Sequence, residues 1–269
     1  MTVRSADPSN ELGRHRRRRR GLLFGILLVI ALLVAVGIVV VDGVARSYAA
    51  DQIEHKIRTE LGLAADTPLR VTVGGFSVLA QLAAGKLDDV RVSGEQVALG
   101  ALTGSIAVHA TGLPIDTKQA VEHLTATIRL DAEDVKKVIG TFGTVPLDSL
   151  TIGDDALHLT SELRVFGAVR IPVGLTLTPS AADGDIVLSP TRVELAGKAI
   201  SAAQVKQQFP TLGDALFQDR SFCIANALPK QLVLQDVRVS GDELVLSFAA
   251  SQLRLDADSL AAKGVCPSP

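Results

Sequence analysis

Histidines are the first side chains to consider for chemistry, because a hydrolase combines a nucleophile with a base and an acid that orients the base. The chain has five, His15, His55, His109, His123 and His158, and it contains no G-x-S-x-G sequence around a nucleophilic serine. Two of them, His109 and His158, fall on the polar faces of expected strands, where solvated side chains are the ordinary outcome. We therefore predict no catalytic residue and expect that the protein is not an enzyme.

Neighbouring acids are the second candidates, because glycosidases work with two carboxyl groups that need only meet in space. All the neighbouring acids lie at expected turns or strand ends, where solvated carboxylates are usual. An enzyme acting on glycolipids stays open as an alternative. The pairs are Asp88 with Asp89, Asp154 with Asp155, and Asp256 with Asp258.

Metal and cofactor motifs are absent from the sequence. There is no H-E-x-x-H, no Walker loop and no dinucleotide-binding fingerprint. The only cysteines are Cys223 and Cys266, and without nearby paired histidines they make a weak zinc site. We expect neither a metal nor a cofactor.

The elements that would position any site are mostly strands. Apolar and polar residues alternate in HLTATIRLD, ALHLTSELRVF, VRIPVGLTLT and DELVLSF. This period of two is typical of antiparallel strands with one buried and one wet face. Runs of about 10 residues extend roughly 33 Å at strand rise. The sequence predicts an α+β fold with one or two long, curved antiparallel sheets.

Three short helices are expected to interrupt the strands and to pack on one sheet face. The first has Ser77 as its N-cap and ends at Gly85, the second begins at Asp131, and the third opens with a capping box of Ser201 and Gln204. The second carries an apolar stripe at helical spacing. That stripe comprises Val135, Val138, Ile139 and Phe142.

The N-terminal region predicts a membrane anchor. Residues 21–41 are 21 uncharged, mostly apolar residues that follow the basic run Arg16–Arg20. About 20 apolar residues span a bilayer as a helix, and a cleaved signal peptide has a shorter apolar region. Positive residues stay on the cytoplasmic side. We expect a cytoplasmic tail over residues 1–20, a transmembrane helix over 21–41 and an extracytoplasmic domain over 42–269.

Charge and composition narrow the partners of that domain. The chain has 27 basic and 29 acidic residues, of which residues 1–41 hold 7 and 2, so the remainder carries a formal charge of −7. A net-acidic domain is a poor general binder of nucleic acid. Only 3% of residues are aromatic, whereas carbohydrate platforms and single-strand sites lean on aromatic stacking. An aliphatic interior suits acyl chains, although it also describes an ordinary core.

The compartment also bears on the two cysteines. Outside the cytoplasm, Cys223 and Cys266 most simply form one disulfide, with two free thiols as the alternative. On the chain-entropy model the closed loop stabilises the fold by about 4 kcal/mol.

One segment carries a family resemblance. The sequence VTVGGFSVLAQLAAGKLDDVRVSG, residues 71–94, resembles the signature of the actinobacterial LmeA-like family of exported phospholipid-binding proteins. Further similarity lies in A-x-x-I-x-x-x-I of the helix expected over 44–61, in RIPVGLTL, and in LP-x-x-L-x-L-x-x-V-R-V before a closing hairpin. The resemblance covers about residues 44–250. It departs at Ser77-Val78, where a proline followed by Phe or Leu is expected.

The resemblance implies an envelope lipid-binding domain, with a long sheet wrapped on helices around an apolar cavity. Our hypothesis is that Phe76, Val78, Leu79 and Leu82 form part of a mouth or wall that accepts acyl chains. Closure of one end of the core is the competing account. Second-tier candidates for lipid contact, for which core packing is the alternative, are Val138, Ile139, Phe142, Phe209 and Leu212.

The sequence therefore favours a membrane-anchored phospholipid-binding protein of the cell envelope, which holds or transfers lipid without covalent chemistry. Its expected partners are phospholipid and the membrane, not nucleic acid, and protein partners are open. One alternative is a structural or interaction module that supports an envelope assembly. The other is an enzyme acting on envelope glycolipids.

Overall fold

The computed structural model describes residues 37, 39–59, 62–64, 66–99, 102–142, 148–165, 169–195, 197–201, 203–204, 207 and 217–266. The chain divides into two units, Met1–Tyr48 and Ala49–Pro269. Residues 39–59 are helical, in agreement with the helix expected over 44–61, and the chain turns at Gly62 with a positive φ of 61°.

The expected transmembrane span, residues 21–41, lies largely outside the described residues. Among the helices that are described, none combines the length and the apolar character needed to cross a membrane. The span stays a prediction.

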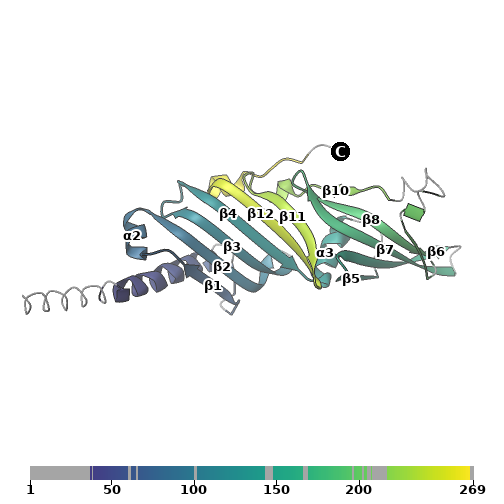
Figure 1. Ribbon diagram of the computed structural model, residues 1–269, viewed down its shortest axis with the longest axis horizontal. Coiled ribbons are helices and arrows are strands. Elements are labelled where there is room, and N and C mark those ends of the chain that lie inside the picture. Colours follow the sequence, from purple (N-terminus) through teal and green to yellow (C-terminus); the bar gives the residue numbers. More distant parts are fainter. Residues whose placement is uncertain are drawn as a thin grey trace, which may run out of the picture. The chain divides into compact units, whose positions relative to one another are not determined.

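Six antiparallel strands form the first sheet, called sheet A, in the order β1-β2-β3-β4-β12-β11. Figure 1 shows the C-terminal strand β12 lying between β4 and β11, so that residues of β4 and β12, far apart in sequence, become neighbours. The bounds are β1 Leu69–Val73, β2 Lys86–Leu99, β3 Leu102–Pro114, β4 Ala120–Leu130, β11 Val233–Ser240 and β12 Glu243–Arg254.

The second sheet, sheet B, is also antiparallel and has the order β10-β8-β7-β6-β5, with β9 paired to β8. The hairpin between β7 and β8 turns at Asp183 and Gly184, which have positive φ values of 54° and 83°. Two such residues suit the tight turns of hairpins. The bounds are β5 Ser149–Gly153, β6 Ala156–Val165, β7 Val169–Ala182, β8 Asp185–Leu195, β9 Lys198–Ser201 and β10 Arg220–Phe222.

Each sheet has one apolar face, as the alternation predicted. In sheet A, Ala126 of β4 lies opposite Phe248 of β12, and Ile128 lies opposite Leu246. Residues directly opposite in an antiparallel pair project from the same face. The intervening positions, such as Thr125 and Thr127, project from the other face. The α+β fold of long antiparallel strands with few helices is confirmed.

The helices begin where the sequence placed their caps. Ser77 Oγ accepts a hydrogen bond from the Ala80 amide at 3.3 Å, and Asp131 Oδ1 accepts one from the Asp134 amide at 2.9 Å. The Ser201–Gln204 capping box also forms, with the Gln204 amide 3.3 Å from Ser201 Oγ. The helical bounds are α2 Val78–Ala83, α3 Ala132–Phe142, α6 Ala257–Ala261 and the short 3₁₀ helix η1 Ala225–Ala227.

A cluster of buried apolar residues in the described part of the chain lies where the two sheets meet α3. It includes Val135 of α3, Leu157 of β6 and Phe248 of β12, all almost inaccessible to solvent. Strands β5 and β7 of sheet B contribute Leu150 and Leu177. One shared core therefore holds both sheets in a single folded unit.

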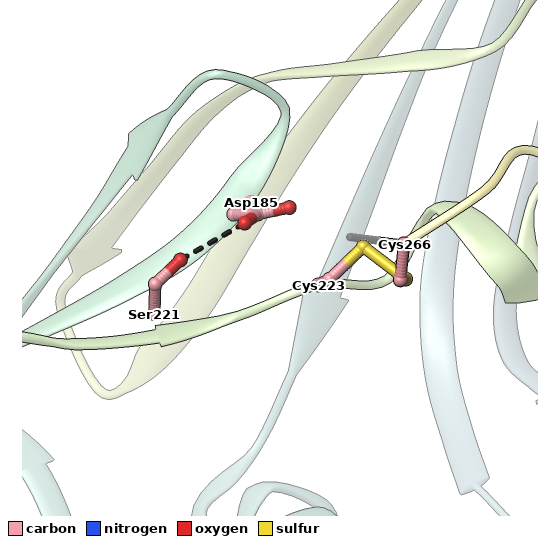
Figure 2. The surroundings of a disulfide bond; sticks show 4 residues. All are labelled: Asp185, Ser221, Cys223 and Cys266. Carbon is pink, nitrogen blue, oxygen red and sulfur yellow. Dashed lines mark hydrogen bonds between the residues drawn. A yellow bond between two sulfur atoms is a disulfide. The ribbon is translucent and has the colours of Figure 1, made fainter. Parts of the chain in front are cut away.

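The predicted disulfide is confirmed. Cys223, just after β10, bonds to Cys266 in the C-terminal segment, with 5.8 Å between their Cα atoms (Figure 2). Beside it, Ser221 Oγ donates a hydrogen bond to Asp185 Oδ2 at 2.9 Å and links β10 to β8 (Figure 2). The bond fixes the end of the described chain to the edge of sheet B.

Two strands of sheet A share an inexact sequence pattern that the sequence analysis missed. Residues 87–94 read LDDVRVSG in β2, and residues 234–241 read LQDVRVSG in β11 and the turn after it. In both copies the Asp and the Arg form an ion pair, Asp89 with Arg91 at 3.0 Å and Asp236 with Arg238. The valines of both copies are buried on the apolar face.

Candidate functional site

The apolar face of sheet A is covered unevenly. Its flanks are buried, as Val90 and Val97 show on β2 and Leu246 and Phe248 show on β12. The side chains at its centre are only half-buried. These central residues are Ile106 and Val108 of β3 with Leu124, Ala126 and Ile128 of β4.

Sheet B shows the same gradation along its strands. Leu157 and Leu177 pair with each other and are buried in the shared core. Two residues along, Leu159 lies opposite Leu175, which lies opposite Val193, and all three are half-buried. Each sheet therefore presents aliphatic carbon that its own helices and loops do not fully cover.

A basic residue lies at the edge of the apolar face of sheet B. Arg220 of β10 pairs with Leu188 of β8, and Leu188 packs against the shared core. Directly opposite residues share a face, so Arg220 projects from the apolar side. Its side chain is exposed, in contrast to the buried Leu177 farther in. The sequence carries no local signal for this position, because β10 is only three residues long.

Three of the five histidines, His109, His123 and His158, occupy cross-strand positions, and His55 lies in the helix over residues 39–59. His109 Nε2 lies 2.8 Å from Asp89 Oδ1, and His158 Nδ1 lies 3.3 Å from Thr176 Oγ1. His123 Nδ1 is 3.3 Å from Ser251 Oγ, and among the described residues no carboxylate is hydrogen-bonded to that histidine. A serine and a histidine without an orienting acid lack the third member of a hydrolase triad. The described part of the chain also gathers no set of three potential metal ligands.

The α2 segment, Gly74–Gly85, joins β1 to β2. Its buried glutamine holds both ends of the segment, since Gln81 Nε2 donates to the Gly74 carbonyl at 3.0 Å and Gln81 Oε1 accepts from the Asp88 amide at 2.8 Å. Gly75 has a φ of 93°, and a Cβ there would lie 2.2 Å from Gln81 Nε2. The glycine and the glutamine together fix the path of the turn before α2.

The four residues that the sequence first suggested for lipid contact differ in their exposure to solvent. Val78 is fully buried, at 0% exposure. The others face solvent, with Phe76 101% exposed, Leu79 40% and Leu82 37%. Core packing therefore accounts for Val78 but not for the other three.

Of the second-tier candidates, Ile139 alone has a side chain that the structure describes. It belongs to α3, is half-buried and packs against the shared core. Val138 and Phe142 belong to α3, but their side chains lie outside the described residues, as do Phe209 and Leu212 altogether.

Helix α3 is held by an ion pair at its first turn. Asp134 is only 3% exposed, and its Oδ1 accepts a hydrogen bond from Lys137 Nζ at 2.8 Å. The lysine holds the pKa of Asp134 below its ordinary value, against the opposing effect of burial, and a hydrogen bond from the backbone of Thr103 adds to the lowering. The charged form of Asp134 therefore ties α3 to β3.

Comparison with known proteins gives one family. A family model described as LmeA-like phospholipid-binding matches residues 40–249. Neither the curated proteins nor the solved structures contain a match.

Proposed function

The chain belongs to the LmeA-like phospholipid-binding family, and from this premise we propose that its two sheets hold the acyl chains of a phospholipid on their apolar faces. The lipid is held without covalent chemistry and is stored or passed on by a protein of the cell envelope. The half-covered aliphatic residues of β3, β4, β6, β7 and β8 carry this proposal.

The physical reason is transfer of hydrocarbon out of water. Each buried CH₂ group contributes about 0.8 kcal/mol, so a single acyl chain along such a face supplies a large part of a binding free energy. Ala126 and Val108, opposite each other at the centre of sheet A, are small, half-buried side chains on its apolar face. An acyl chain lying there would bury the central side chains as fully as Phe248 and Val97 are already buried.

Substitutions on adjacent positions of β4 test the proposal. Ala126→Asp places a charge on the apolar face, Ala126→Phe fills the space with carbon, and Thr125→Asp places the same charge on the opposite, exposed face. After detergent-free purification of each variant lacking residues 21–41, extraction and mass spectrometry measure the phospholipid per chain. We expect Thr125→Asp to match the parent and both Ala126 variants to lose most of the lipid.

The Ala126→Phe variant controls for loss of lipid through unfolding, because it adds no buried charge. Circular dichroism and the thermal transition establish that each variant is folded before its lipid is counted. Ala126 variants that fold and still carry the parent amount of phospholipid would refute the apolar face of sheet A as the binding surface.

We also propose that residues 21–41 anchor the chain with its main domain outside the cytoplasm. The basic run before this segment supports the orientation, and the Cys223–Cys266 disulfide supports an oxidising compartment. After an alkaline wash, the full chain should stay with the membrane, and a chain lacking residues 21–41 should be soluble. A mature protein whose N-terminus begins beyond residue 41 would contradict the anchor.

A further inference from the structure

We propose that the α2 segment, Gly74–Gly85, is a membrane-docking surface that inserts its apolar side chains into the interface of a phospholipid bilayer. This surface is separate from the sheet faces assigned to a bound lipid, and the inference does not require that a lipid be held there.

The α2 segment exposes an apolar surface to solvent. The twelve residues carry no charge. Every exposed side chain among them is apolar: Phe76, Leu79 and Leu82, together with the smaller Ala80, Ala83 and Ala84. The only polar side chains, Ser77 and Gln81, are turned to the protein, one as the cap of α2 and the other in the interior. Apart from the half-buried Ser77, the side chains that meet water over the segment are therefore all apolar.

The backbone of the segment is also hydrogen-bonded within the protein at its two turns. The Gly74 amide donates to the Asp89 carbonyl at 2.7 Å, and the Gly74 carbonyl accepts from Gln81. At the other end, the Gly85 amide donates to Leu82 and the Gly85 carbonyl accepts from the Ile115 amide at 3.0 Å. Water would satisfy such groups in solution, whereas lipid offers no partners, so internal bonding is what a lipid-facing turn requires.

An exposed isoleucine and a paired lysine and glutamate lie next to the α2 segment. Ile115, bonded to Gly85 and itself exposed, extends the apolar surface onto the turn between β3 and β4. The ion pair at the base of the segment joins Lys86 Nζ to Glu122 Oε1 at 2.8 Å and largely cancels its own charge. Attachment should therefore be hydrophobic, independent of anionic lipid and insensitive to salt.

The geometry favours a bilayer over a protein partner. Phe76 is fully exposed on a turn that Gly75 and Gln81 hold in place, and fully buried Val78 anchors α2 beside it. A fully exposed aromatic side chain in an uncharged segment suits the interface of a membrane, where amphipathic helices bury their apolar face.

The absence of tryptophan from the chain provides a local probe. Full-length Phe76→Trp is mixed with phosphatidylcholine vesicles whose acyl chains are brominated or unmodified. We expect a blue shift of the emission, and loss of at least half of its intensity on the brominated vesicles only. The matched control is Val265→Trp, an exposed apolar position in the C-terminal segment, which should show neither change.

Two further samples separate docking from lipid held on the sheets. In Phe76→Trp lacking residues 21–41, which the proposed anchor no longer holds in the bilayer, removing the vesicles by centrifugation should restore the emission of the probe, whereas a carried lipid would continue to quench it. Adding Ala126→Asp to Phe76→Trp should leave the quenching unchanged, even if that variant no longer retains phospholipid. Docking and lipid retention can thus fail independently.

A charged variant completes the test. Phe76→Trp combined with Leu79→Glu and Leu82→Glu alters only exposed side chains, so the fold should persist while quenching falls several-fold. Equal quenching at positions 76 and 265 would overturn the proposal. So would a blue shift without quenching, which signals burial against protein, or quenching that survives removal of the vesicles.

Discussion

Gln81 has a side chain whose hydrogen bonds join the two ends of the α2 segment. It is a buried polar residue between exposed alanine and leucine neighbours, and its amide group bonds Gly74 and Asp88 at the two ends of the α2 segment. A helix of six residues has little stability of its own. Its position therefore depends on this amide and on the burial of Val78.

Replacing Gln81 with Ala should destabilise the protein by about 2–6 kcal/mol, because two backbone groups each lose a partner at about 1–3 kcal/mol. Urea denaturation measures the change in the free energy of unfolding, and hydrogen exchange should rise over residues 74–88. Gln119→Ala, at an exposed position in a turn, should change stability by less than about 0.5 kcal/mol. Equal effects of the two substitutions would show that the amide bridge is unimportant.

Asp134 is a second residue whose contribution can be isolated, this time by pH. Its pKa is lowered in the folded protein by Lys137, so it stabilises the fold at pH values above the ordinary aspartate value of 3.8. That contribution disappears as the pH falls through the lowered pKa of the folded state. Asp134→Asn should cost about 2 kcal/mol near neutral pH, where hydrogen bonds to a charged group are lost.

Chemical denaturation of parent and variant from pH 7 to below 3.8 checks this expectation. The stability difference should be constant down to about pH 4 and should shrink in stronger acid. Glu133→Gln, an exposed acid in the same first turn of α3, serves as the control and should show little difference at any pH. A difference for Asp134→Asn that is unchanged in acid would contradict the ion pair as its cause.

At the scale of elements, local signals predicted most of what the structure contains. Alternation identified the strands and their two faces because the period of two is a property of each strand alone. The caps at Ser77, Asp131 and Ser201 were also readable, since each involves a residue only three positions away. The pairing of β4 with β12 was not, because Ala126 and Phe248 are more than a hundred residues apart.

The candidate site was predicted less well than the fold. The sequence singled out the α2 segment but could not divide it into buried Val78 and exposed Phe76, Leu79 and Leu82. That division depends on how α2 packs on β2, which no local pattern encodes. The half-covered positions, such as Ala126 and Leu175, read like any other core position, because coverage of a sheet face is decided by elements distant in the chain.

The edge strand β10 carries a prediction about the lipid head group. Arg220 projects from the apolar side of sheet B, where a guanidinium can pair with a phosphate. Arg220→Glu should lower the retained anionic phospholipid several-fold, as measured by mass spectrometry of lipid extracted from the full chain. Arg192→Glu, on the opposite face beside Thr176, is the matched control and should retain the parent amount. Equal losses would show that Arg220 has no special contact.

At the scale of the whole molecule, the proposed function gives both sheets the same role, which is to hold acyl chains on their apolar faces. They share a core at α3, and aliphatic side chains of both sheets that pack against this core, such as Ile128 and Leu175, are only half-buried. A protein that buried all its apolar faces would gain stability but could not accept a hydrocarbon chain. Family membership and this uneven burial point in the same direction, toward a protein whose apolar faces are completed by lipid.

The most direct test of that claim is to map where an acyl chain lies. The full chain is loaded with a phospholipid that carries a photoactivatable group on its acyl chain, illuminated, digested and analysed by mass spectrometry. We predict crosslinks to the half-covered apolar residues, Ile106, Leu124, Ile128, Leu159 and Leu175. Crosslinks confined to the opposite face, at Arg91, His109 or Thr125, or no crosslinks at all, would contradict the account.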